Sequence, residues 1–150
     1  MSDHANEKTI ESLSVLLAST YTLYIKTHNY HWNVTGPMFS TLHALFEMQY
    51  TELAAAVDEI AERIRVLGAY APGSASAFSK LSKIAEENGH PSAIEMIQSL
   101  ASDQGTIESV ARDVIEAAEA NGDQPSVDLA IRRQEIHGKN AWMLKSHLEK

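Results

Sequence analysis

The sequence predicts an all-α protein, built as a bundle of four long helices. Two observations indicate this architecture. Apolar residues recur at spacings of three and four along four long stretches, and breaks containing Gly or Pro separate those stretches. The chain has 150 residues, 44% of them hydrophobic, which suits one domain with a sizeable core. We therefore expect a single domain over residues 1–150, with a short flexible N-terminal tail at about residues 1–6.

The first predicted helix spans residues 7–30, where an apolar stripe follows the helical period. The members of this stripe are Ile10, Leu13, Leu17, Tyr21 and Tyr24. Gly36-Pro37 stops the helix, and Ser40 has the side chain of an N-cap residue. The second predicted helix spans residues 41–67, is rich in the good helix formers Ala, Leu and Glu, and ends at Gly68.

The second half of the chain contains two more long helices. Residues 69–91 are mostly small and turn-prone, but residues 78–87 are expected to form a short helix. The third long helix is predicted over residues 92–120 and the fourth over residues 126–148. The first and second long helices are joined by a short connection, and so are the third and fourth. The two helices of each pair therefore lie antiparallel. The long segment between the second and third long helices can cross the bundle, which is the connectivity of ferritin-like bundles.

Composition narrows the classes of function. The chain has no cysteine, which excludes disulfides, thiolate metal sites and cysteine nucleophiles, and we expect a cytoplasmic protein. No apolar run is long enough to span a bilayer, and the N-terminus lacks the features of a secretory signal. The formal net charge of −8 favours metal cations over the phosphate backbone of nucleic acid.

Acidic residues gather on one side of the second predicted helix. His43, Glu47, Asp58 and Glu62 lie within about 100° of one another around its axis. Because apolar residues share this side, it is at least half buried, and charged groups there need partners. A salt-bridge network with Arg63 and Arg65, as near neighbours, is the ordinary explanation; a metal site is the functional one.

Two histidines favour the metal site. His31 lies near the end of the first helix and His43 near the start of the second, so a short antiparallel connection brings them together. Two imidazoles with two or three carboxylates suit iron, zinc or manganese. Taken alone, a histidine such as His31 on an apolar helix face is more often a core residue than a metal ligand. For His28 two roles remain open: hydrogen bonding to a metal ligand, or packing. The remaining histidines, His4, His90, His137 and His147, are interpreted as surface residues.

The helical rise separates the candidate ligands. Asp58 lies fifteen residues after His43, which corresponds to about 22 Å along one helix. One subunit therefore cannot bring both to the same metal. A two-fold partner running antiparallel would place its own Asp58 and Glu62 beside His31 and His43, creating two equivalent sites. The Glu-x-x-His motif, which serves bundles that hold two irons within one subunit, occurs on none of the four predicted long helices.

Four short motifs along the chain together match those of a known family. Residues 31–39 read HWNVTGPMF, Leu42-His43 follows, and residues 58–64 read DEIAERI. Together with AWML at residues 141–144, this pattern closely resembles the Dps family, the bacterial and archaeal mini-ferritins, over nearly the whole chain.

The resemblance implies a fold and an activity. It implies a hollow dodecamer of four-helix subunits, with a short extra helix in the crossover. It also implies a ferroxidase site between two subunits, with His31 and His43 from one chain and Asp58 and Glu62 from its neighbour. There Fe(II) is oxidised, usually by hydrogen peroxide in preference to oxygen, and ferric mineral is stored in the cavity. Trp32 resembles the aromatic residue that quenches stray oxidising equivalents.

Three further residues have weaker assignments. Glu47, on the same side of its helix as His43, is a candidate ligand for a second iron. Asp123 and Asp128 resemble family residues that line three-fold pores for iron uptake. Capping of the fourth helix is the alternative, and we favour it for Asp123, because an acidic side chain is favourable near a helix N-terminus.

The tails depart from the family pattern. Many Dps proteins bind DNA through lysine-rich tails, whereas the N-terminal segment here has only Lys8 beside acidic residues, and the C-terminal segment has Lys145 and Lys150 around Glu149. We therefore expect little or no DNA binding. The competing interpretations are a DNA-compacting Dps protein and a bundle with structural zinc at the same ligands.

Overall fold

The computed structural model describes residues 3–149, with side chains from residue 6 onward. Five α-helices and one 3-10 helix follow one another along the chain, and no strand occurs in this part of it. The helices are α1 (Asp3–Asn33), α2 (Phe39–Val66), α3 (Ala75–Leu81), α4 (Ala93–Ala120), α5 (Gln124–Lys145) and the 3-10 helix η1 (Ser146–Leu148). The structure therefore confirms the predicted all-α bundle with a short extra helix in its long crossover.

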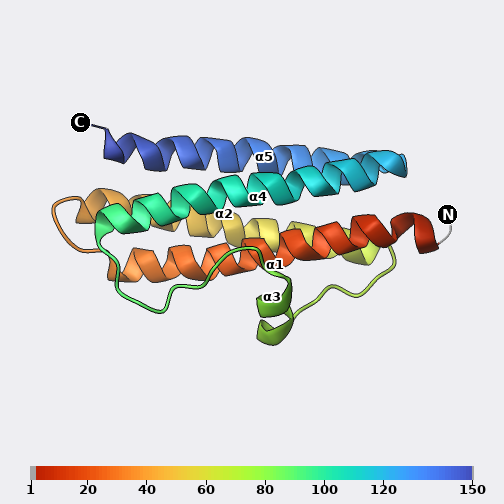
Figure 1. The fold of residues 1–150 in the computed structure, drawn as a ribbon, viewed down its shortest axis with the longest axis horizontal. Coiled ribbons are helices and arrows are strands. Elements are labelled where there is room, and N and C mark those ends of the chain that lie inside the picture. The colour runs from red at the N-terminus through yellow and green to blue at the C-terminus, as the bar shows by residue number, and fades with distance from the viewer. Residues whose placement is uncertain (1–2, 150) are drawn as a thin grey trace.

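Four long helices lie side by side along the long axis of the molecule (Figure 1). α1 packs against α2 and α4, and α4 packs against α5. The crossover returns along the whole bundle between the end of α2 and the start of α4, and α3 stands on it beside α1 (Figure 1). This return makes α2 and α4 run in the same direction, as in ferritin-like bundles. None of the described helices is long and apolar enough to cross a membrane.

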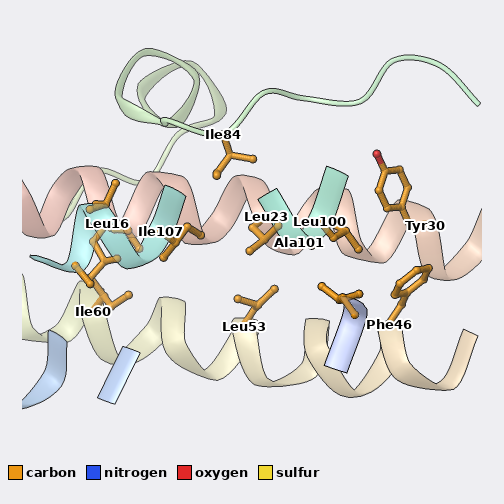
Figure 2. Close-up of a cluster of buried hydrophobic side chains, with 14 of the residues drawn as sticks. Leu16, Leu23, Tyr30, Phe46, Leu53, Ile60, Ile84, Leu100, Ala101 and Ile107 are labelled. Atoms are coloured by element: carbon orange, nitrogen blue, oxygen red, sulfur yellow. The ribbon is translucent and has the colours of Figure 1, made fainter. Parts of the chain in front are cut away.

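The core lies between the four long helices (Figure 2). It is a single cluster of mostly Leu, Ile and Val side chains, with Tyr30 and Phe46 as its largest members. Burying side chains of this size contributes roughly 1.5–3 kcal/mol each relative to leaving them exposed. The core fixes how each helix is rotated about its axis, and this rotation decides which residues face outward.

Several helix boundaries differ from the expected ones by a few residues. α1 begins at Asp3, so most of the expected tail is helical; residues 1 and 2 lie outside the described part of the chain. α2 begins at Phe39 with Met38 as its N-cap, so the predicted capping role of Ser40 is wrong and this residue lies inside the helix. The short helix begins earlier, because the Ser74 side chain caps it by accepting a hydrogen bond from the Ala77 N–H, and it ends at Leu81.

The crossover after α3 is extended because it is anchored to the bundle. Ile84 is buried against the core, and the Lys26 ammonium donates a hydrogen bond to the Ala85 carbonyl at 3.2 Å. The Tyr30 hydroxyl donates to Glu87 Oε1 at 2.6 Å. These anchors explain why residues 82–87 do not continue the predicted helix.

The prediction of a surface position for His137 is wrong. His137 is fully buried, its Nδ1 lies 2.6 Å from Gln104 Oε1, and its Nε2 lies 3.1 Å from the Arg133 guanidinium. Arg133 in turn makes two hydrogen bonds to Glu52, at 2.5 and 3.0 Å. His90 is exposed as predicted, His147 is half-buried, and the side chain of His4 lies outside the described part. The spacing of four places Arg133 and His137 on one face of the helix. Because both are polar, the sequence did not indicate that this face is buried.

Candidate metal centre

Two histidines lock each other in place where α1 ends and α2 begins. His31 Nδ1 donates to the His43 carbonyl at 2.7 Å, and His43 Nδ1 donates to the His31 carbonyl at 2.7 Å. Their rings stack with centroids 3.8 Å apart. The short turn between the helices makes this pairing geometrically accessible, and Gly36 supplies its left-handed backbone with φ of +100°.

The reciprocal hydrogen bonds determine which nitrogen is available. A carbonyl oxygen can only accept, so Nδ1 of each ring carries the proton and Nε2 keeps a lone pair. This backbone contact is the arrangement that orients a metal-binding histidine. Glu47 approaches from one turn along α2, with its Oε1 3.7 Å from His31 Nε2. His31, His43 and Glu47 therefore form one half of a candidate ligand set.

Asp58 and Glu62 lie far from this half-site within one chain. Both are exposed on α2, and the fifteen-residue separation of Asp58 from His43 on that unbroken helix amounts to about 22 Å. Among the described residues, no group of three or more His, Asp or Glu side chains could hold a metal ion within one chain. The single subunit thus presents two separate half-sites, one where α1 ends and α2 begins and the other farther along α2.

The arginines proposed as partners for these carboxylates bind elsewhere. Arg63 donates to Asp123 Oδ1 at 2.8 Å and to Ser126, and Arg65 donates to the Ala69 carbonyl while its guanidinium lies over the Tyr70 ring. The salt-bridge network that would have explained Asp58 and Glu62 structurally does not form with these two residues.

Exposed apolar side chains surround the histidine half-site. Trp32, directly after His31, is 63% exposed, and Met48, directly after Glu47, is 51% exposed. The exposed Phe39 ring stacks on His43 with centroids 5.0 Å apart. Large apolar side chains gathered in this way on a surface are typical of a face that another protein chain covers.

An aromatic cluster backs the half-site. The His28 ring lies between Trp32, at 3.9 Å, and Tyr50, at 4.2 Å, and Tyr50 also meets the His31 ring edge-on at 5.2 Å. Burial, with a smaller contribution from His31, lowers the pKa of His28, so its neutral form is favoured at neutral pH. Of the two roles predicted for His28, these contacts support packing. No role was predicted for Tyr50 from the sequence, although it falls on the same side of α2 as His43.

The two aspartates near the start of α5 differ. Asp123 is buried, caps α5 by accepting from the Ser126 N–H, and pairs with Arg63. The structure therefore supports capping for Asp123, the role favoured for it above. Asp128 is exposed on the next turn and accepts a hydrogen bond from Gln124 at 2.8 Å. It does not cap the helix, so its carboxylate remains available at the surface.

Comparisons with known proteins concern the chain as a whole. The ferritin-like domain family matches residues 10–150. The chain is 37% identical to an uncharacterised low temperature-induced protein of Nostoc, covering 99% of this chain and 84% of that one. It is also 37% identical to the DNA protection during starvation protein of Brevibacillus brevis, covering 89% of each.

A solved structure extends the likeness to three dimensions. The Dps protein of Vibrio cholerae O1 superposes with a TM-score of 0.93 and 33% identity, covering 97% of this chain and 92% of that one. That protein is described as a member of a broad superfamily of ferritin-like diiron-carboxylate proteins. The likeness concerns the entire bundle and not a single motif.

Proposed function

This chain belongs to the Dps family of ferritin-like proteins, and on that premise we propose that it oxidises Fe(II) at sites shared between two subunits and stores the ferric product. Each site would combine His31, His43 and Glu47 of one chain with Asp58 and Glu62 of a second copy. The observation that carries the proposal is the pair of reciprocal histidine hydrogen bonds, which leaves both Nε2 lone pairs available to a metal, that of His31 3.7 Å from Glu47 Oε1.

The ligand set suits a substrate that changes charge. Imidazole nitrogens bind Fe(II), and carboxylate oxygens favour the harder Fe(III) that forms. Two Fe(II) ions supply one electron each, so the O–O bond of hydrogen peroxide breaks to two hydroxides without releasing a hydroxyl radical. Glu47 is the candidate to hold the second iron, because its carboxylate is exposed yet lies 3.7 Å from His31 Nε2. Hydrogen peroxide is the proposed oxidant in preference to oxygen.

The assembly follows from the incomplete half-sites. An isologous two-fold contact through the α1–α2 face pairs each histidine half-site with the acidic half-site of the other copy. The same contact covers Trp32, Phe39 and Met48, whose exposure in the single chain is otherwise unfavourable. We propose that such dimers assemble into the dodecameric cage that the family resemblance implies, with ferric mineral inside it.

Mixing two inactive variants tests the shared site. One variant carries His31→Ala and His43→Ala; the other carries Asp58→Asn and Glu62→Gln. Each alone should lose fast Fe(II) oxidation by hydrogen peroxide. When the two are dissociated, mixed equally and reassembled, a mixed dimer regains one intact site of two, so activity should return to about one quarter of the wild-type value. No recovery in correctly reassembled cages would refute the intersubunit site.

A matched control separates the site from histidine loss in general. His90 is exposed on the crossover, so His90→Ala should leave Fe(II) oxidation unchanged. Unchanged oxidation in the double histidine variant would instead remove His31 and His43 from the site. Peroxide consumption on Fe(II) addition also distinguishes this function from a structural zinc site, which would consume none.

A further inference from the structure

We propose that a row of contacting tyrosine rings, Tyr50, Tyr24 and Tyr21, carries one-electron oxidising equivalents away from the metal centre toward α3. The row comprises these three residues and is called the tyrosine row below. The inference rests on the proposed iron oxidation, because that reaction supplies the oxidant.

The tyrosine row begins at the site itself. Tyr50 on α2 meets the His31 ring edge-on at 5.2 Å and stacks on His28 at 4.2 Å. His28 in turn contacts Trp32 at 3.9 Å. An oxidant formed beside His31 therefore has two oxidisable side chains close by, Trp32 on the exposed side and Tyr50 on the inner side.

From Tyr50 the tyrosine row leads away from the site. Its ring lies 6.0 Å from Tyr24, which lies 5.9 Å from Tyr21, one turn earlier on α1. Tyr21 stacks on Phe78 of α3 at 4.7 Å. All three tyrosines are half-buried. Each step joins rings in direct contact, within the usual separation of aromatic pairs.

The placement of the other tyrosines makes the row distinctive. The chain has five tyrosines, and three of them form this row. Tyr30 is outside it, with its hydroxyl donating to Glu87, and Tyr70 is exposed, with the Arg65 guanidinium over its ring. The core between the helices is otherwise built mainly from Leu, Ile and Val, which do not transfer electrons readily.

The chemistry balances with reactants that the site handles. When a single Fe(II) meets hydrogen peroxide, it gives Fe(III), hydroxide and a hydroxyl radical. The radical takes a hydrogen atom from the Tyr50 hydroxyl, forming water and a tyrosyl radical. Tyr24 then returns a hydrogen atom equivalent, as an electron and a proton, to Tyr50 and becomes the radical, and Tyr21 does the same for Tyr24. A thiol in solution can finally reduce the Tyr21 radical and itself becomes oxidised.

The test removes one hydroxyl from the middle of the row. Assembled cages receive Fe(II) and limiting hydrogen peroxide without added thiol, and peptide mass spectrometry locates oxidised side chains. Tyr24→Phe keeps the ring contacts but cannot form the radical. We expect a severalfold loss of oxidised Tyr21, a gain of oxidised Tyr50 and Trp32, and an unchanged rate of Fe(III) formation. Tyr70→Phe, outside the row, should leave the oxidation of Tyr21 as in the wild type.

The outcomes distinguish this inference from the proposed function. Normal Fe(III) formation with equal Tyr21 oxidation in wild type and Tyr24→Phe would overturn the tyrosine row alone, because it would indicate direct attack on Tyr21. Absence of Fe(III) formation in the wild type would overturn the proposed function and the role of the row with it. If Tyr24→Phe fails to assemble, Tyr50→Phe must lose oxidation at both Tyr24 and Tyr21, and retention of either would refute the path.

Discussion

The buried His137 should make the stability of the protein depend on pH. Its imidazole is enclosed between α4 and α5, with Gln104 on one nitrogen and the Arg133 guanidinium on the other. Glu52 lies on the far side of Arg133 and neutralises that charge. Burial, with a smaller contribution from Arg133, lowers the pKa of His137 to about 3, from an ordinary value of 6.5.

The sign and size of the effect follow from this lowered pKa. Below pH 6.5 the unfolded chain binds a proton at His137 that the folded chain does not bind until about pH 3. Stability is therefore fully present above pH 6.5 and is lost as the pH falls toward 3. At about 1.4 kcal/mol per pH unit, lowering the pH from 7.5 to 5.0 should cost about 2 kcal/mol per subunit through this residue alone.

A substitution isolates the contribution of His137. In His137→Gln, the amide can donate to Gln104 and accept from Arg133, but it does not titrate. Urea unfolding of the metal-free protein, at one protein concentration and at both pH values, gives the free energy of unfolding. Wild type should lose about 2 kcal/mol more than His137→Gln. His90→Gln, at an exposed position, should follow the wild type. Equal losses in wild type and His137→Gln would refute the reasoning.

Four further predictions follow from single features. Gln49 is buried with both amide atoms lacking a protein partner, so we expect bound water there; Gln49→Met should lower the midpoint of thermal unfolding, and a higher midpoint would show a dry site. Asp128→Asn should slow iron uptake into intact cages, and unchanged uptake would remove Asp128 from the uptake path. Zn²⁺ bound before Fe(II) should slow its oxidation, because Zn²⁺ accepts the same ligands. A gel-shift assay at about 0.15 M salt should detect no DNA complex.

Local rules explain how much of the fold the sequence predicted. Helical periodicity and the Gly and Pro breaks depend on neighbouring residues, and they located four long helices and the crossover. Predictions from neighbouring residues failed where a contact with a residue distant in the sequence determines the local structure. Glu87 and Ala85 leave the predicted short helix because α1 binds them through Tyr30 and Lys26.

The candidate site was predicted in part for the same reason. His31 and His43 were paired correctly because a short turn constrains them, and the helical rise alone separated Asp58 from His43. The sequence left two alternatives for Asp123, and only its contacts with Ser126 and Arg63 decided between them. The reciprocal Nδ1 hydrogen bonds were likewise visible only in the structure.

By itself, then, the sequence determined the helices and the separation of Asp58 from His43 along α2, because these follow from spacing along one chain. The tertiary structure decided the rotation of each helix and its register against non-neighbouring helices. That register buries His137 beside Gln104 and Arg133, and it aligns Tyr21 and Tyr24 of α1 with Tyr50 of α2. Such contacts depend on how the whole core packs, since shifting one helix by a turn would change every one of them.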